Sequence, residues 1–378
     1  MLTTIRDFCR DRLEEGGETS AAEVRHGRHF AGYGKGDGAA GAGRRETGAG
    51  WQQLQPDLDN LAVASRRAIE RADADVAVGA YLAAAEVWNV RGPFGLSRQL
   101  GESVLEIREG RAPRLGDVLF ALAETERLSG RSEEARERHE AALSAYRGAG
   151  DRNAEGVVLA KLGLLHKRNG HPEVARKHFE AALRIHRETG DRDSEANLLG
   201  NLGILHLHQG RVGQAREHYE AALAIHREIG NRRAEGIGLS NLGSLHIELG
   251  RSEEARHYLE AALTLYCDIG DRRGEGAALR NLGNLSKSQG RYDEARRHFE
   301  AALLIFQEAE DRNTEAAALG DLGSLFADEG RKKEERSHLE AALAIYREIG
   351  NRNEEGIVIF YLEIIVFVLC LVEAYFLD

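Results

Sequence analysis

Apolar residues recur at helical spacing in two consecutive stretches of a unit that is 40 residues long. In one such unit, Leu199, Leu202 and Leu205 are three residues apart, and Tyr219 and Leu223 follow at a spacing of four. Residues three and four positions apart share one face of a helix, so each stretch predicts an amphipathic helix. A short turn that contains glycine separates the two stretches, which predicts a pair of antiparallel helices in each unit.

The unit is repeated six times without a gap between Arg111 and Gly350. Self-similarity at such a period is typical of stacked supersecondary units, each of which buries its apolar face against its neighbours. The repeat therefore predicts an all-α fold, a solenoid of antiparallel helix pairs.

Glycine has three recurrent places in the unit. It occupies the turn inside each unit, as at Gly210, where a left-handed backbone ends a helix without steric cost. Between units it precedes a residue able to cap the next helix, as in Gly190-Asp191 and Gly230-Asn231. It also lies in the middle of the first helix, where it costs about 1 kcal/mol relative to alanine. We expect close approach of the second helix to compensate that cost. The mid-helix positions are Gly163, Gly203, Gly243, Gly283 and Gly323.

The order and spacing of small and large residues resemble the tetratricopeptide repeat. Gly203, Ala215, Tyr219 and Ala222 follow one another in the order that is typical of that family. The ordinary repeat has 34 residues, so the longer unit resembles the 40-residue relatives in kinesin light chain and Pins-type adaptors. The resemblance covers about two thirds of the chain and implies a right-handed superhelix. It also implies that the first helices line a concave face where partners bind.

The sixth unit departs from this pattern because Glu335 replaces the small alanine. A buried carboxylate without a partner would cost several kcal/mol. We therefore expect local loosening of the helix pair at this position.

The first 110 residues resemble a different protein class. Three stretches carry this resemblance: M-L-T-T-I-R-D-F at 1–8, R-H-G-R-H-F at 25–30 and D-L-D-N-L at 57–61. They resemble the segment that follows the nucleotide domain in bacterial STAND-class signalling ATPases and transcriptional regulators. The stretch 84–92 resembles their helical arm. The chain contains no phosphate-binding loop of the form G-x-x-x-x-G-K-[ST]. We therefore predict that it binds no ATP and needs no cofactor.

These observations predict five segments. They are a remnant helical segment at 1–33, a flexible Gly/Ala-rich linker at 34–50, a degenerate helical-pair arm at 51–110, six tetratricopeptide units at 111–350, and an apolar C-terminal helix at 351–378.

The charge composition of the chain argues against one class of function, nucleic-acid binding. The chain has a formal net charge of -11 and 30% charged residues, with arginine and glutamate interspersed. Nucleic-acid binding needs clustered cations, so this class is disfavoured. Three cysteines, Cys9, Cys267 and Cys370, have neither metal-ligand nor paired spacing, and no secretory signal opens the chain. We expect a cytoplasmic protein.

The histidines predict no metal site. Sets such as His166, His206 and His246 repeat at 40 residues and so fall on successive helix pairs. Helix axes lie about 10 Å apart, whereas metal–ligand bonds are about 2 Å long. A structural role is therefore favoured, and no nucleophile and base converge in the sequence to suggest an enzyme.

The interaction surface predicted from the resemblance follows the first helices. An extended peptide or a protein domain would lie along it, with asparagine side chains bonding its backbone, although these asparagines could instead bond neighbouring turns. The predicted partner-binding residues are Asn201, Asn241, Asn281, His208, Ser244, Glu248, Arg280, Asn284 and Lys287. The favoured function is a non-catalytic protein-interaction scaffold in intracellular signalling. The alternatives are a detached sensor arm of a STAND-type ATPase and a membrane-attached scaffold.

The C-terminus departs from the repeat after Gly356, where an apolar run extends to Leu377. Four interpretations remain open: a capping helix, a membrane segment, a partner-binding helix, or a change of reading frame. Self-association through 357–378 is a further possibility, because a large exposed apolar surface favours association. Residues 351–357 still follow the repeat, so we expect the first turns to dock like an ordinary first helix.

Overall fold

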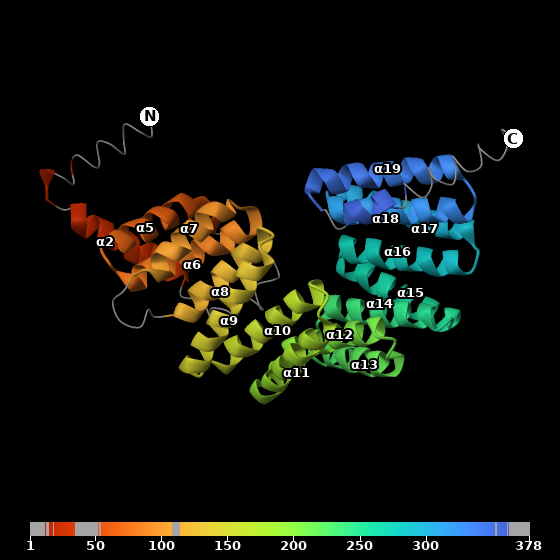
Figure 1. The fold of residues 1–378 in the computed structure, drawn as a ribbon, viewed down its shortest axis with the longest axis horizontal. Helices are drawn as coiled ribbons and strands as arrows, with labels where there is room; N and C mark the ends of the chain where they lie inside the picture. Colours follow the sequence, from red (N-terminus) through yellow and green to blue (C-terminus); the bar gives the residue numbers. More distant parts are fainter. Residues whose placement is uncertain are drawn as a thin grey trace. The chain divides into compact units, whose positions relative to one another are not determined.

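The computed structural model describes residues 12, 15–17, 19–34, 52, 54–107, 114–351, 354–360 and 362. Throughout this part of the chain the regular secondary structure is helical, so the prediction of an all-α fold built from antiparallel helix pairs is confirmed (Figure 1). The chain forms two compact units, Met1–Leu198 and Leu199–Asp378, called unit 1 and unit 2 below.

Unit 1 begins with a group of helices, called the arm below, which combines the described parts of the predicted segments 1–33 and 51–110, and it continues with two regular helix pairs. The arm comprises α2 (Thr19–Ala31), η1 (Gly32–Gly34), η2 (Gln55–Asp57), α5 (Leu58–Glu70), α6 (Ala74–Arg91) and α7 (Phe94–Leu105). The pairs are α8 (Leu115–Leu128) with α9 (Ser132–Ala149), and α10 (Arg152–Arg168) with α11 (Pro172–Thr189).

The arm and the first regular helix share one hydrophobic core. Tyr81 and Trp88 of α6, Leu100 of α7 and Leu122 of α8 are buried in the same cluster. Side chains that pack at interior density hold their helices together. The arm is therefore continuous with the first helix pair.

Unit 2 repeats one helix pair along its length. Its helices are α13 (Val212–Glu228), α14 (Arg232–Glu248), α15 (Ser252–Ile269), α16 (Arg272–Ser288), α17 (Tyr292–Glu308), α18 (Arg312–Asp328) and α19 (Lys332–Ile349). The helix α12 (Arg192–His208) contains the boundary between the units. Within unit 2, α14 pairs with α15, α16 with α17, and α18 with α19, and each second helix also contacts the next first helix.

The glycines act as the sequence predicts. Gly210 and Gly250, inside the turns, have φ of 71° and 68°, and Gly230, between two 40-residue repeats, has φ of 70°. The next residue caps the following helix, since the Asn231 side chain accepts a 3.1 Å hydrogen bond from Ala234 N. A left-handed glycine thus ends one 40-residue repeat, and the N-cap residue that follows it begins the next repeat.

Close approach at the mid-helix glycines is confirmed. A Cβ atom added at Gly203 would lie 2.5 Å from the Tyr219 ring, and one added at Gly243 would lie 2.5 Å from Leu259. No real Cβ contact is this short, so glycine lets the large side chain of the second helix reach the first helix backbone.

The expectation of an unpaired Glu335 is wrong. Its carboxylate accepts a 2.9 Å hydrogen bond from Lys332 Nζ, one turn earlier in α19. The helix is regular, but a Cβ at Gly323 would meet Leu339 at 3.0 Å, which is half an ångström farther than the equivalent contact at Gly243. The bulkier residue therefore loosens the pair only slightly.

Residues 354–360 are helical and pack on α18 and α19 through Val358, which is buried among Leu343 and Tyr346. This packing agrees with docking of the first turns after the sixth unit. The predictions for 363–378 lie outside the described residues, as do those for 1–11 and 35–51. In the part of the chain that the structure describes, no helix is long and apolar enough to cross a membrane.

Candidate functional site: the first-helix surface

The first helices of unit 2 form a continuous surface. Helix α14 contacts α16, and α16 contacts α18, so residues 40 positions apart come side by side. Asn241 on α14 and Asn281 on α16 occupy the same register and are both half-buried. We call the surface around them the first-helix surface of unit 2.

The amides of Asn241 and Asn281 make no side-chain hydrogen bond to the residues that the structure describes. A primary amide carries two donors and an acceptor with two lone pairs, so each side chain retains hydrogen-bonding capacity. Asn201 on α12 has the same register and is also half-buried, but it already has an interaction partner.

The two predicted cations on this surface are neutralised by the neighbouring helix. Arg280 Nε lies 2.6 Å from Asp321 Oδ2. Lys287 Nζ lies 3.3 Å from Asp328 Oδ2 and donates a 2.6 Å hydrogen bond to Ser324 Oγ. Both ion pairs join α16 to α18, so their first role is to hold adjacent first helices in register.

The remaining predicted residues differ in exposure. His208, Glu248 and Asn284 are exposed, and Ser244 is half-buried on the same side of α14 as Asn241. Ile237, one turn before Asn241, is 52% exposed. The surface thus combines amide and hydroxyl groups with an accessible aliphatic side chain, a set suited to a peptide backbone with apolar side chains.

Sequence reasoning missed a charged cluster in unit 1. Glu124 on α8 lies 2.9 Å from Arg127, 3.8 Å from Lys161 on α10 and 3.3 Å from the buried ring of His139 on α9. Burial alone would raise the pKa of Glu124, but the His139 contact and the two cations hold it well below its ordinary value. The period gives Lys161 the register of Asn201, 40 residues later, but it does not indicate the contacts with Glu124 and His139.

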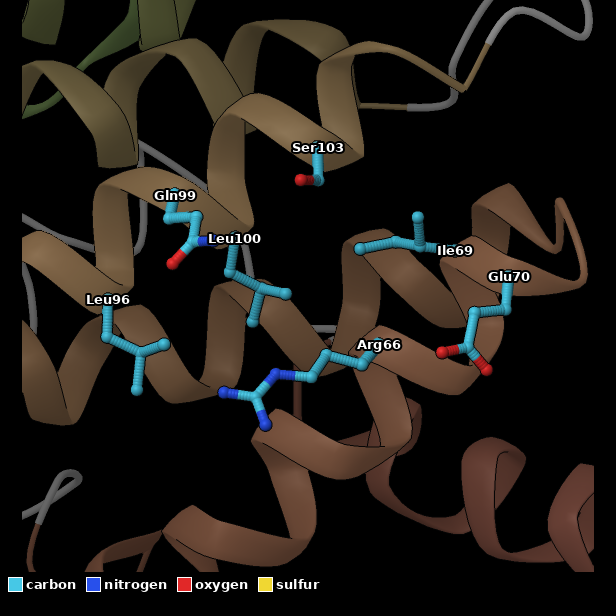
Figure 2. Close-up of a pocket in the computed structure, with 7 residues that line it drawn as sticks. All are labelled: Arg66, Ile69, Glu70, Leu96, Gln99, Leu100 and Ser103. Atoms are coloured by element: carbon cyan, nitrogen blue, oxygen red, sulfur yellow. The ribbon is translucent and has the colours of Figure 1, made fainter.

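A shallow pocket of about 300 Å³ lies between α5 and α7 of the arm (Figure 2). Leu96, Leu100 and Ile69 supply its apolar part. Figure 2 shows the Arg66 guanidinium extended toward Leu96, with Glu70 on the other side of the pocket. Its remaining lining residues are Gln99 and Ser103. This pocket could not be predicted from the sequence, because it depends on how α5 and α7 pack.

The histidine sets contact rings of their own helix pair. His166 stacks on His178 with ring centroids 5.2 Å apart, and His246 stacks on Tyr258 at 5.3 Å. Among the described residues, no group of three or more His, Cys, Asp or Glu side chains could hold a metal ion. His166 and His246 therefore take part in packing within their helix pairs.

Residues 114–188, 194–268 and 274–348 match the family described as tetratricopeptide repeat. Together these matches cover more than half of the chain. The chain belongs to the tetratricopeptide-repeat family, which confirms the resemblance noted in the sequence.

Three solved structures show the same fold. A Rap protein complexed with Competence and Sporulation Factor has a TM-score of 0.55 and 13% identity, and the match covers 93% of this chain and 99% of that chain. The STAND protein PH0952 from Pyrococcus horikoshii, which has a tetratricopeptide repeat sensor, has a TM-score of 0.52 and 16% identity, covering 87% of this chain and 55% of that one. BtubC (BKLC) from P. vanneervenii has a TM-score of 0.50 and 20% identity, covering 56% of this chain and 92% of that one. No curated protein matched the chain in the sequence comparison.

Proposed function

We propose that this chain is a non-catalytic protein-interaction scaffold in intracellular signalling, and that it binds an extended peptide or protein segment along the first-helix surface of unit 2. The observation that carries the proposal is the pair of half-buried amides at Asn241 and Asn281, which lie on contacting helices and have no side-chain hydrogen bond within the described residues.

Amide side chains in this arrangement suit a peptide backbone. Each can donate to a carbonyl and accept from an N–H group, so the backbone of an extended segment would find partners on both α14 and α16. Ser244 and Asn284 would add hydrogen bonds beside them, and the exposed aliphatic side chain of Ile237 would contact apolar residues of the segment. His208 and Glu248 would lie at the edge.

Charge favours such a ligand over a phosphorylated one. Arg280 and Lys287 are each paired with an aspartate of α18, so a phosphate would have to break an existing ion pair. A neutral backbone with apolar side chains would leave both pairs intact. The Rap protein that shares this fold is complexed with Competence and Sporulation Factor, which supports a peptide or protein ligand here by analogy alone.

The test is selection of peptides from a random display library on the immobilised full-length chain. We expect selected peptides to bind the wild type and to lose at least tenfold in affinity to a variant with Asn201, Asn241 and Asn281 changed to Ala, equivalent to about 1.4 kcal/mol. A control variant carries Thr264→Ala on the exposed side of α15 and should bind normally. Equal binding to all three proteins would contradict the proposed surface.

A second candidate function is the sensor part of a STAND-type ATPase that acts together with a separate nucleotide-binding subunit. It is favoured by the shared core that joins the arm to α8, together with the sequence resemblance of the arm. Co-purification of the tagged chain from its native cell should then yield a nucleotide-binding protein in a fixed ratio. Absence of such a protein from repeated purifications would exclude this candidate.

A further inference from the structure

The pocket between α5 and α7, called the arm pocket below, has an apolar inner part and a polar rim (Figure 2). Its most buried lining residue is Leu100, which is 4% exposed, and Ile69 and Leu96 beside it are half-buried. Arg66 and Glu70 are exposed at the rim. The volume of about 300 Å³ lies at the lower end of the range for small-ligand sites, about 300–1,000 Å³. The arm pocket therefore suits a small ligand with an apolar body and polar ends.

Arg66 and Glu70 give the arm pocket one unpaired charge of each sign. An arginine and a glutamate four residues apart on a helix can pair, but Figure 2 shows the guanidinium extended toward Leu96 and the carboxylate on the other side of the pocket. Neither side chain forms an ion pair or a hydrogen bond with the residues that the structure describes. The other arginine of α5, Arg67, lies 3.3 Å from the carboxylate of Glu23 on α2. Arg66 is thus the arginine of α5 that is available to a ligand.

A ligand that complements these charges carries a carboxylate for Arg66 and an ammonium group for Glu70. A simple carboxylic acid or a simple amine would satisfy only one of the two side chains. Four residues of a helix rise about 6 Å, and the two side chains extend to opposite sides of the pocket. The charged groups of the ligand must therefore be farther apart than those of a free amino acid, which share one carbon atom. A tripeptide with free ends reaches about 10 Å when it is extended.

The facing side of α7 suits the backbone and side chains of such a peptide. Gln99 and Ser103 lie four residues apart on this helix, and neither has a hydrogen-bond partner among the described residues. The amide of Gln99 and the hydroxyl of Ser103 can each donate to a peptide carbonyl and accept from a peptide N–H group. Leu96 and Leu100, with Ile69 on α5, would contact an apolar side chain of the ligand.

We propose that the arm pocket binds a short apolar peptide with free ends, whose terminal carboxylate pairs with Arg66 and whose terminal ammonium group pairs with Glu70. A guanidinium group can hold a carboxylate through two parallel hydrogen bonds, which fixes the direction of the peptide. The site uses residues of unit 1 alone. It therefore does not rest on the proposed binding surface of unit 2, and the two proposals are tested separately.

Calorimetric titration of the full-length chain with the tripeptide Leu-Leu-Leu tests the proposal. Three matched probes accompany it: the N-acetylated tripeptide, the C-amidated tripeptide, and ω-aminooctanoic acid, which has both charges but no peptide group. We expect the free tripeptide to bind, and each of the other probes to bind about tenfold more weakly or worse, because each lacks hydrogen bonds that the free tripeptide makes. Binding of the free tripeptide should also weaken as the salt concentration rises.

Two substitutions assign the ends of the ligand. Arg66→Gln should weaken the free tripeptide about tenfold but leave the amidated one unchanged, since that probe has no carboxylate to lose. Glu70→Gln should do the same for the free and the acetylated tripeptide. The control Arg28→Gln removes an exposed arginine of α2 that does not line the pocket, and it should bind normally.

Three outcomes would overturn the proposal. They are no binding of the free tripeptide at millimolar concentration, equal binding of ω-aminooctanoic acid, and equal losses in all three variants. Arg66 and Glu70 are exposed, so the substitutions should leave the helices intact, and circular dichroism of each variant checks this.

Discussion

Arg187 Nε donates a 2.8 Å hydrogen bond to Oε1 of Glu195, across the junction between two helix pairs. Glu195 is only 5% exposed, and its other oxygen accepts from Arg192. The same contact recurs at Arg147–Glu155, Arg227–Glu235 and Arg347–Glu355, at 2.8 to 2.9 Å. At each of these four junctions, one carboxylate therefore links the end of a second helix to the start of the next first helix.

Removing this carboxylate should destabilise the junction. In Glu195→Ala both arginines lose a charge-assisted hydrogen bond, and we expect a loss of about 1–3 kcal/mol in the free energy of unfolding. Denaturation by urea, followed by circular dichroism, measures the change. The control Glu180→Ala removes an exposed partner of Arg176 and should cost at most about 1 kcal/mol. Equal effects from the two substitutions would argue against a special role for the junction carboxylate.

One junction in unit 2 offers the reverse experiment. Cys267 is exposed and stands at the register of Arg227, so Glu275 pairs with Arg272 but lacks the partner from the preceding helix. Cys267→Arg should restore that bond and place a cation in the last turn of α15. We expect a gain of about 0.5 kcal/mol in stability. Thermal unfolding at low ionic strength checks this, with Cys267→Ala as the reference. The gain should shrink at high salt, and a gain that ignores salt would contradict the ion-pair explanation.

Two glycines of α12 should respond oppositely to alanine. A Cβ at Gly203 would lie 2.5 Å from Tyr219, whereas one at Gly200 would meet nothing within 4 Å. Gly203→Ala should therefore overpack the pair and cost about 1–3 kcal/mol, while Gly200→Ala should gain up to about 1 kcal/mol through helix propensity. Denaturant titration of both variants gives the comparison. If Gly203→Ala were stabilising, the close approach would not be the reason for glycine at this position.

These contacts show what sequence could and could not predict. The helix pairs, their caps and the role of Gly203 follow from the 40-residue period and from local chemistry within a single repeat. The Glu124–His139–Lys161 cluster involves three helices, and its members are 15 and 37 residues apart, so only the packing brings them together. Lys332 and Glu335 are three residues apart, a spacing at which side chains on one helix can interact. The prediction of an unpaired Glu335 was wrong because it did not include this neighbour.

At the candidate site, the sequence predicts the positions of Asn241 and Asn281 but not their hydrogen bonds. Their register follows from the 40-residue period, but whether each side chain bonds its own helix depends on rotamers and neighbours. Likewise, the period implies that α16 and α18 are in contact. It does not give the side-chain geometry by which Asp321 neutralises Arg280.

The stacked histidines of unit 1 predict loss of stability in mild acid. His166 and His178 lie 5.2 Å apart between α10 and α11. Burial is the main cause that lowers the pKa of each ring below its ordinary value of about 6.5. Proximity of the two rings lowers the pKa of His178 further, and His171 and Arg136 do so for His166, whereas Glu140 opposes the shift in both.

A lowered histidine pKa means that the unfolded chain binds protons more readily than the folded one. Stability from this pair is thus complete above about pH 6.5 and falls as the pH decreases through that value toward the folded pKa. Replacing His178 by the residue that its register carries at Tyr258, in His178→Tyr, should flatten the slope of unfolding free energy between about pH 5 and 7. Urea titrations across this range measure the slope. The control is His257→Tyr, which replaces an exposed histidine of α15. An unchanged slope in His178→Tyr would show that the stacked pair does not carry the pH dependence.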